Sequence, residues 1–223
     1  MAANHQPLFL HEEIMLLALR DETGVMESGA WYSFAMGGAI LSELLLAGRV
    51  EIDGGKKPLV DLLNRDPLGC EVLNECLAKV AAAKRRASPQ TWVSRFANLN
   101  QLRHRVAMGL CDRRILRNDV GTVLLVFKRK VYPEINPRPE KELIERLRKA
   151  IFSDARTVDP RTTILVALAG AGDLLKISFD RKELKRRKDR IDRMIDGDLA
   201  GKATKQAVSA AQAAVAMGAV IST

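Results

Sequence analysis

The chain has 223 residues, of which 47% are hydrophobic and 4% aromatic, and it carries a formal net charge of +9. This composition argues against a disordered chain and against a β-sandwich, and it favours helices that pack through leucine and alanine. A positive charge of this size favours an anionic partner, which is either nucleic acid, an acidic membrane surface or an acidic protein.

The cysteines and the N-terminal residues indicate a reducing compartment. Cys70, Cys76 and Cys111 are an odd number and lack the spacing of a metal site, so we expect neither a metal nor a cofactor. The N-terminus has no basic segment followed by an apolar run, which predicts a cytoplasmic protein without a signal peptide. No stretch reaches the ~20 apolar residues of a membrane span, so membrane attachment is expected to be peripheral.

The pattern along the chain predicts a mostly α-helical fold. Residues 1–7 are expected to be a flexible start, and residues 8–223 a single globular helical domain with a buried central bundle. The first helix is predicted over residues 8–20, where Glu12 and Glu13 lie near the positive end of the helix dipole.

A central helix is predicted over residues 34–47, in which Glu43 is the single charged residue. A helix that is apolar on every face must be buried on every face. A loop over residues 25–33, which contains Trp31, is expected to lead into it.

After the central helix, Gly48 suits a left-handed helix end, residues 49–52 alternate as a short strand, and residues 53–55 form a turn. Further helices are predicted at residues 69–86, from Pro89 onward behind the N-cap Ser88, at 99–113, 139–153, 160–177 behind the N-cap Asp159, 180–196 and 202–220.

A change of period near residue 115 predicts a β-hairpin, which completes a set of three short strands. Residues 115–117 form its first strand, 118–121 its turn and 122–127 its second strand, which ends in the cations of 128–130. Residues 131–139 contain three prolines and are expected to be a linker.

Catalytic motifs are missing from the sequence. His5, His11 and His104 are scattered, and no metalloprotease, nucleophile-elbow, P-loop or dinucleotide-binding pattern stands in a strand–helix context. We therefore predict that the protein is not an enzyme.

The order of these landmarks resembles the Golgi phosphoprotein 3 family, and the Ala- and Arg-rich composition suggests a prokaryotic-type member. The motifs that carry the resemblance lie at residues 8–24, 38–49, 102–106, 115–116 and 173–175. The resemblance implies a cytosolic, mostly helical protein. Eukaryotic members bind phosphatidylinositol 4-phosphate on Golgi membranes.

The resemblance also implies a lipid headgroup site, of which this chain retains a part. The family places a tryptophan before the buried helix, and Trp31 is the nearest one, about three residues closer to that helix. Gly37 occupies the position of a family arginine early in the helix. On the later helix Arg103 matches one family arginine, Asn100 falls on the other, and Arg105 is a further cation beside it.

Two alternatives stay open for these residues. Arg103 and Arg105 are two positions apart, about 200° around a helix, so they do not share a face. Each either binds a phosphate through its guanidinium or belongs to a solvated or ion-paired helix face. Trp31 either covers a headgroup at a membrane interface or packs as a core or rim aromatic.

The predicted hairpin carries an apolar run followed directly by cations, namely Val123, Leu124, Leu125, Val126, Phe127, Lys128, Arg129 and Lys130. One hypothesis is shallow membrane insertion, with each cation contributing about 1 kcal/mol near an anionic leaflet. The family resemblance adds self-association through the hairpin. The alternative is a strand buried against the bundle.

Three functions are therefore considered. The first is a peripheral protein on the cytosolic face of a membrane that binds anionic phospholipid headgroups, phosphoinositide or other, and serves as an adaptor for protein clients. The second is a winged-helix-like nucleic-acid-binding protein, which the basic charge and the helix–hairpin order suggest but for which no helix-turn-helix is evident. The third is an interaction protein that forms oligomers through the hairpin.

Overall fold

The computed structural model describes residues 7–19, 31–123, 127–196, 210 and 212–213. These residues form ten helices and two small antiparallel strand pairs, so the prediction of a mostly α-helical fold is confirmed. The elements in chain order are α1 Leu10–Ala18, α2 Trp31–Leu46, β1 Val50–Ile52, β2 Val60–Leu62, α3 Glu71–Ala81, α4 Pro89–Ala97, α5 Leu102–Asp112, β3 Asp119–Val123, β4 Phe127–Val131, α6 Arg138–Phe152, α7 Pro160–Ala171, α8 Leu175–Ser178, α9 Arg181–Arg186 and α10 Lys188–Ile195.

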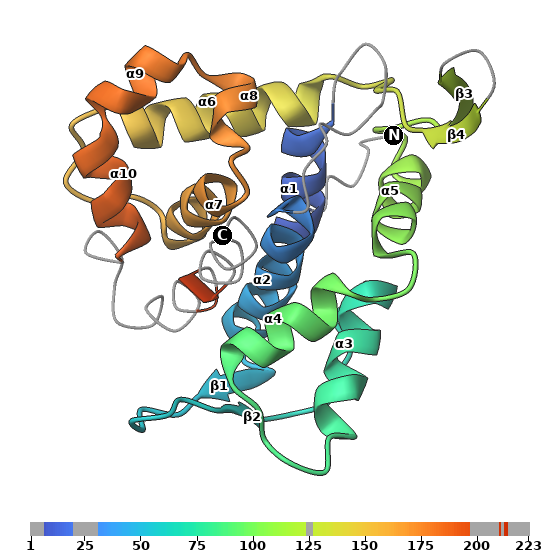
Figure 1. The fold of residues 1–223 in the computed structure, drawn as a ribbon, viewed down its shortest axis with the longest axis vertical. Helices are drawn as coiled ribbons and strands as arrows, with labels where there is room; N and C mark the ends of the chain where they lie inside the picture. Colours follow the sequence, from blue (N-terminus) through green and yellow to red (C-terminus); the bar gives the residue numbers. More distant parts are fainter. Residues whose placement is uncertain (1–6, 20–30, 124–126, 197–209, 211, 214–223) are drawn as a thin grey trace, which may run out of the picture.

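Helix α2 lies at the centre of the molecule, as predicted for an all-round apolar helix. It packs most extensively against α4 and α1, and it also contacts α7 and α3. Figure 1 shows α1 and α2 in the middle, with α3 and α5 on one side and α6 to α10 on the other. Residues 39–44 of α2 are all buried, including Ser42 and Glu43.

None of the helices formed by the described residues is both long enough and apolar enough to cross a membrane.

Local capping chemistry sets several of the helix ends. Gly48 adopts φ 63°, the left-handed conformation predicted for it. The Ser88 hydroxyl accepts a hydrogen bond from the Thr91 amide at 3.2 Å, and the Asp159 carboxylate accepts one from the Thr162 amide at 2.9 Å. The predicted N-caps Ser88 and Asp159 are therefore confirmed, each with proline at the next position.

Other predicted boundaries were wrong for identifiable reasons. Helix α2 begins at Trp31, three residues before the predicted start, so residues 31–33 are helical and not a loop. Helix α3 ends at Ala81 because the chain beyond it turns back to pair Ala87 with Val60. The predicted helix over 160–177 is broken where Asp173 adopts φ 58°.

The basic stretch predicted as one helix over 180–196 is also divided, into α9 and α10, at Arg187. Its guanidinium donates to the Asp154 carboxylate at 2.8 Å and to the Phe152 carbonyl at 2.7 Å. This anchor on the segment after α6 fixes the position of the break. Most of the predicted last helix, 202–220, lies outside the described residues.

The first strand pair was predicted in part. Strand β1 matches the alternating segment after Gly48, and it pairs with β2, which the sequence analysis missed. The two strands lie in register with Val50 opposite Leu62 and Ile52 opposite Val60.

The predicted β-hairpin exists, but its register was wrong. Strands β3 and β4 pair antiparallel, with Val120 opposite Lys130 and Val123 opposite Phe127. Residues 119–121, which were predicted as part of the turn, therefore belong to β3, and residues 124–126 lie outside the described residues. Residues 115–117 form no strand, although Leu116 makes a single bridge to Glu134. The β-branched content of residues 122–127 predicted one continuous strand, whereas Val123 belongs to β3 and Phe127 to β4.

The packing of α2 on α4 depends on Gly37. A Cβ atom at this position would lie 2.4 Å from the Val93 carbonyl oxygen and 3.0 Å from the Ala97 amide nitrogen. The backbones of the two helices therefore touch, and no larger side chain fits at residue 37 without separating them.

We expect Gly37→Ala to lower the free energy of unfolding by about 1–3 kcal/mol, the usual cost of overpacking a core. Gly109→Ala in α5 is the matched control, because its added methyl would meet only the Glu12 Oε1 atom at 3.8 Å. Removing a helical glycine there is expected to raise stability by up to ~1 kcal/mol. Urea denaturation followed by circular dichroism measures both, and equal effects would contradict backbone contact at Gly37.

Candidate functional site

Helix α5 presents Arg103 and Arg105 on different faces, as the helical geometry predicts. Arg105 faces α3, where its guanidinium contacts the Glu75 carboxylate at 2.5 Å and the Glu71 carboxylate at 2.8 Å. Both carboxylates belong to α3, so Arg105 ties the two helices together. Of the two alternatives given for Arg105, the structure therefore shows the ion-paired helix face.

Arg103 has a different environment. Its side chain is half-buried, and its Nε atom is buried without a hydrogen-bond partner. The positive charge of Arg103 acts on Tyr132: burial raises the pKa of the Tyr132 hydroxyl, and the guanidinium opposes that rise. An unbonded buried donor costs roughly 1–3 kcal/mol, so this position of Arg103 is held at a cost in stability.

A chain of polar contacts runs from the base of the hairpin to α5. The Lys130 ammonium lies 3.2 Å from His104 Nε2, and His104 Nδ1 lies 2.7 Å from the Tyr132 hydroxyl oxygen. An ammonium only donates, so Nε2 accepts and Nδ1 carries the proton. Desolvation and the charge of Lys130 both lower the pKa of His104, which keeps the imidazole neutral.

The N-terminus of α5 adds to this positive region. Gln101, the N-cap, adopts φ 51° and forms no side-chain cap, and the first turn contains no acidic residue. The first amide groups of a helix lack intrahelical partners and attract anions. Asn100 is exposed in the turn just before the helix, not one turn earlier within it as predicted, because the left-handed Gln101 delays the helix start to Leu102.

The structure describes the two other residues of the implied headgroup site unequally. Trp31 is the first residue of α2, and its side chain lies outside what the structure describes. Gly37 faces the backbone of α4 and serves helix packing.

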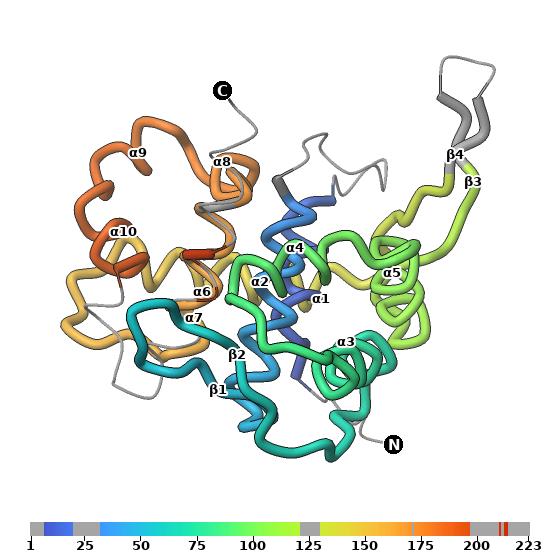
Figure 2. The backbone as a smooth tube through the Cα atoms, turned by 60° about the horizontal axis from the view of Figure 1, so that its bottom comes forward, coloured from blue at the N-terminus to red at the C-terminus, as the bar shows by residue number. Residues whose placement is uncertain are grey.

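The hairpin residues lie next to this region. Figure 2 shows β3 and β4 leaving the body of helices beside α5. Val120 is 60% exposed on β3, whereas Val131 and Tyr132 at the base are buried. Val123 and Phe127 are paired across the hairpin, and Lys128, Arg129 and Lys130 belong to β4 instead of following it. Leu124, Leu125 and Val126 lie outside the described residues.

A second polar cluster was missed by the sequence analysis, which attributed Glu12 and Glu13 to the helix dipole. Both carboxylates are buried inside the protein. Glu12 contacts Arg113, at the end of α5, at 2.8 Å, and Glu13 contacts Arg146 of α6 at 2.7 Å. Desolvation raises the pKa of both carboxyl groups, although the arginines oppose it.

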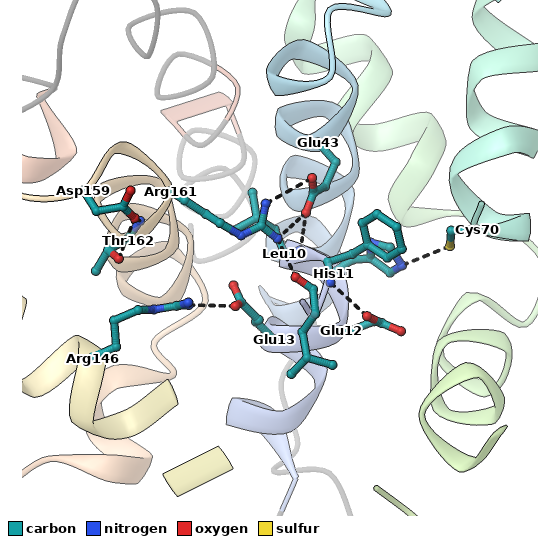
Figure 3. A network of polar contacts seen from close by, with 12 residues as sticks. Leu10, His11, Glu12, Glu13, Glu43, Cys70, Arg146, Asp159, Arg161 and Thr162 are labelled. Atoms are coloured by element: carbon teal, nitrogen blue, oxygen red, sulfur yellow. Dashed lines mark hydrogen bonds and ion pairs between the residues drawn. The ribbon is translucent and has the colours of Figure 1, made fainter. Parts of the chain in front are cut away.

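Glu43 of α2 is the third buried carboxylate. Arg161 of α7 donates to it at 2.6 Å and also to the Leu8 carbonyl at 2.6 Å, while the Leu10 amide donates to the same carboxylate. Figure 3 shows how these groups meet between α1, α2 and α7. The sequence contained a signal for this ion pair, because a charged residue inside an all-round apolar helix requires a buried partner.

His11 lies in the same cluster and contacts Cys70. Its Nε2 atom is 3.7 Å from the Cys70 sulfur, its ring stacks on Phe9, and its Nδ1 atom is buried without a partner. Burial, reinforced by the charge of Arg161, lowers the pKa of His11 to about 3. Burial also raises the pKa of the Cys70 thiol, so the pair is a neutral thiol and a neutral imidazole. No three metal-binding side chains converge within the described ranges.

Together these features define a mostly helical protein built around one buried helix, with a positive region where α5 meets a projecting hairpin. The model of a family described as Golgi phosphoprotein 3 (GPP34) matches residues 10–211. The match covers most of the chain, so this protein belongs to the Golgi phosphoprotein 3 family.

Two curated relatives are similar to the chain. Vacuolar protein sorting-associated protein 74 of Schizosaccharomyces pombe is 29% identical over 173 residues, which are 68% of this chain and 50% of the relative. The protein of the same name from Eremothecium gossypii is 26% identical over 160 residues, which are 63% of this chain and 48% of the relative. The chain thus spans about half the length of the curated relatives it matches.

The lowered pKa of His11 predicts a pH-dependent stability. The unfolded chain binds a proton near pH 6.5, but the folded chain resists it down to about pH 3. His11 therefore lowers the free energy of unfolding as the pH falls below 6.5, by ~2 kcal/mol between pH 7 and pH 5.

His11→Leu is expected to remove that part of the pH dependence. Glu12 and Glu13, whose raised pKa values act in the opposite direction, are common to both proteins and cancel in the difference. Urea denaturation at pH 7, 6 and 5 measures the effect. Parallel curves for the two proteins would show that His11 is not buried in the neutral form.

Proposed function

We propose that this protein is a peripheral membrane protein that binds anionic phospholipid headgroups through the N-terminus of α5 and the adjoining base of the hairpin. The main supporting observation is Arg103, a half-buried cation that pairs with no carboxylate in the described part of the chain. A phosphate oxygen is a suitable acceptor for that group.

The distribution of ion pairs supports this choice of region. Arg105 is neutralised by Glu71 and Glu75 of the facing helix. In contrast, neither Arg103 nor Lys130 contacts a carboxylate in the described part of the chain. Both cations act on the same pair of residues, since Lys130 contacts His104 and the charge of Arg103 acts on Tyr132.

The helix end and the hairpin supply further attraction. The start of α5, which has no side-chain cap, favours negative charge beside Arg103 through the helix dipole. Val120 is an exposed apolar side chain near the base of the hairpin, and Lys130 is exposed opposite it. An apolar contact combined with cations is typical of reversible attachment to an anionic surface.

Family membership supports the finer parts of the proposal. Phosphatidylinositol 4-phosphate is the headgroup that the family resemblance implies, and another anionic lipid would offer the same phosphate chemistry. The relatives are named for vacuolar protein sorting, which fits an adaptor that recruits client proteins at the cytosolic face of a membrane. A non-catalytic binding role also fits the absence of catalytic motifs from the sequence.

Arg103→Gln is expected to weaken binding to vesicles that contain phosphatidylinositol 4-phosphate by roughly 10- to 150-fold, because a charge-assisted hydrogen bond contributes ~1.5–3 kcal/mol. Co-sedimentation with phosphatidylcholine vesicles that contain this lipid measures the change. Vesicles with phosphatidylserine at equal total charge test whether the headgroup or only the charge is recognised.

Arg105→Gln is the matched control, since it removes the same charge two residues away but breaks ion pairs worth ~0–1 kcal/mol each. Its vesicle binding should stay near that of the unaltered protein, and its small stability loss is read from urea denaturation. Equal weakening of vesicle binding by both variants would show that binding depends on net positive charge and not on a site at Arg103. Duplex DNA bound more tightly than vesicles at the same salt concentration would favour the nucleic-acid alternative.

The hairpin is expected to contribute to the same attachment. Because Val120 and Lys130 are directly paired, a two-residue Asn-Gly turn can replace residues 121–129 and keep the base of the hairpin intact. This variant should retain its helical circular dichroism and lose most vesicle binding or self-association. The double variant Leu124→Ser and Leu125→Ser should likewise retain its helical circular dichroism and lose vesicle binding or self-association.

Sedimentation velocity separates loss of vesicle binding from loss of self-association. A general loss of helicity and thermal stability in both hairpin variants would show that this segment belongs to the core, and the buried-strand alternative would then hold.

A further inference from the structure

A groove lies along the outer face of α3, away from the region described above. It is bounded on one side by α3 and on the other by the segment that precedes this helix. Its lining consists of Arg65, Pro67, Asn74, Leu77, Ala78, Ala81 and Ala82. Figure 1 shows α3 at the opposite end of the molecule from β3 and β4, so the groove is separate from the proposed headgroup site.

Small side chains create this groove. Ala78 and Ala82 are exposed and Ala81 is half-exposed, whereas Leu77 is buried beneath them. Alanine at these successive turns of a helix leaves a shallow apolar channel that longer side chains would fill. Its volume is about 390 Å³, which lies within the ~300–1,000 Å³ typical of small-molecule sites.

The wall opposite α3 is held in place by hydrogen bonds. The Asn64 side-chain amide donates to the Gly48 carbonyl at 3.2 Å, and the Arg49 guanidinium donates to the Asp66 carbonyl at 2.9 Å. The Leu68 amide donates to the Asn74 side-chain oxygen at 2.8 Å, which joins the wall to α3 itself. The groove is therefore formed before anything binds, and its wall needs little ordering when a ligand enters.

The polar groups of the groove select for negative charge. Arg65 is exposed and has no carboxylate partner among the residues that the structure describes. Asn74 uses its oxygen to accept from Leu68, which leaves its NH₂ group as a donor. The groove thus combines an apolar floor with two donors, one of them charged, and its lining contains no acidic residue.

We propose that this groove binds an amphiphilic anion, namely an aliphatic chain that ends in a carboxylate. The chain lies over Leu77 and the three alanines, and the carboxylate meets Arg65 and the Asn74 amide. The proposal is independent of the headgroup site, because it shares no residue with α5 or the hairpin. It assigns to the protein a ligand that does not have to reside in a bilayer.

Isothermal titration with decanoate, below its micelle concentration, tests the proposal on the full chain. We expect saturable binding at one site, and octanoate should bind about 15-fold more weakly, since each methylene changes affinity roughly fourfold. Arg65→Gln should weaken decanoate about two- to fivefold, as expected for an exposed ion pair, and leave neutral decanol unaffected.

Ala78→Leu should abolish decanoate binding, because leucine fills the groove while it preserves the helix. Gln90→Leu adds the same side chain at an exposed position of α4 outside the groove and should leave binding intact. Methyl resonances of Ala78, Ala81 and Ala82 should shift during the titration. Absent or non-saturable binding, or binding that survives Ala78→Leu, would overturn the assignment and favour another occupant, such as a protein segment.

Discussion

The buried carboxylates of α1 and α2 constrain the arrangement of the other helices. Glu12, Glu13 and Glu43 each require a cation, and the partners come from the end of α5, from α6 and from α7. Losing one partner of a buried pair costs roughly 3–5 kcal/mol, because a charge is left uncompensated. Apolar packing has no preferred direction, whereas these hydrogen-bonded pairs are satisfied in one register only. The central helix therefore fixes the positions of its neighbours through charge as well as through burial.

Elements whose chemistry is local could be predicted from the sequence. The all-round apolar character of α2, the glycine at residue 48 and the caps at Ser88 and Asp159 each act within a few residues, and each was predicted correctly, although α2 begins three residues before its predicted start. The break at Arg187 could not be predicted, since it depends on a guanidinium that reaches residues 152 and 154. The hairpin register failed for a related reason: alternation predicts a strand but does not say which residues form its turn.

The candidate site was predictable to a similar extent. Spacing alone separated Arg103 from Arg105, because two residues on a helix lie on different faces. It did not reveal which arginine would meet Glu71 and Glu75, since those partners lie some 30 residues away. The contact between His104 and Tyr132 joins α5 to a segment that the sequence suggested was only a linker. Contacts between distant segments are invisible to periodicity, and they decide which charges remain unneutralised.

The backbone contact at Gly37 has a mechanical consequence. Helix α4 rests directly on α2, and a short turn through Gln101 leads from α4 into α5. The position of the start of α5 therefore depends on a backbone–backbone contact between α4 and the central helix. No side chain that could change rotamer lies between these two backbones. A direct backbone contact of this kind allows little relative movement of the two helices. The direction in which the first amide groups of α5 point is therefore set by the position of α4 on the central helix.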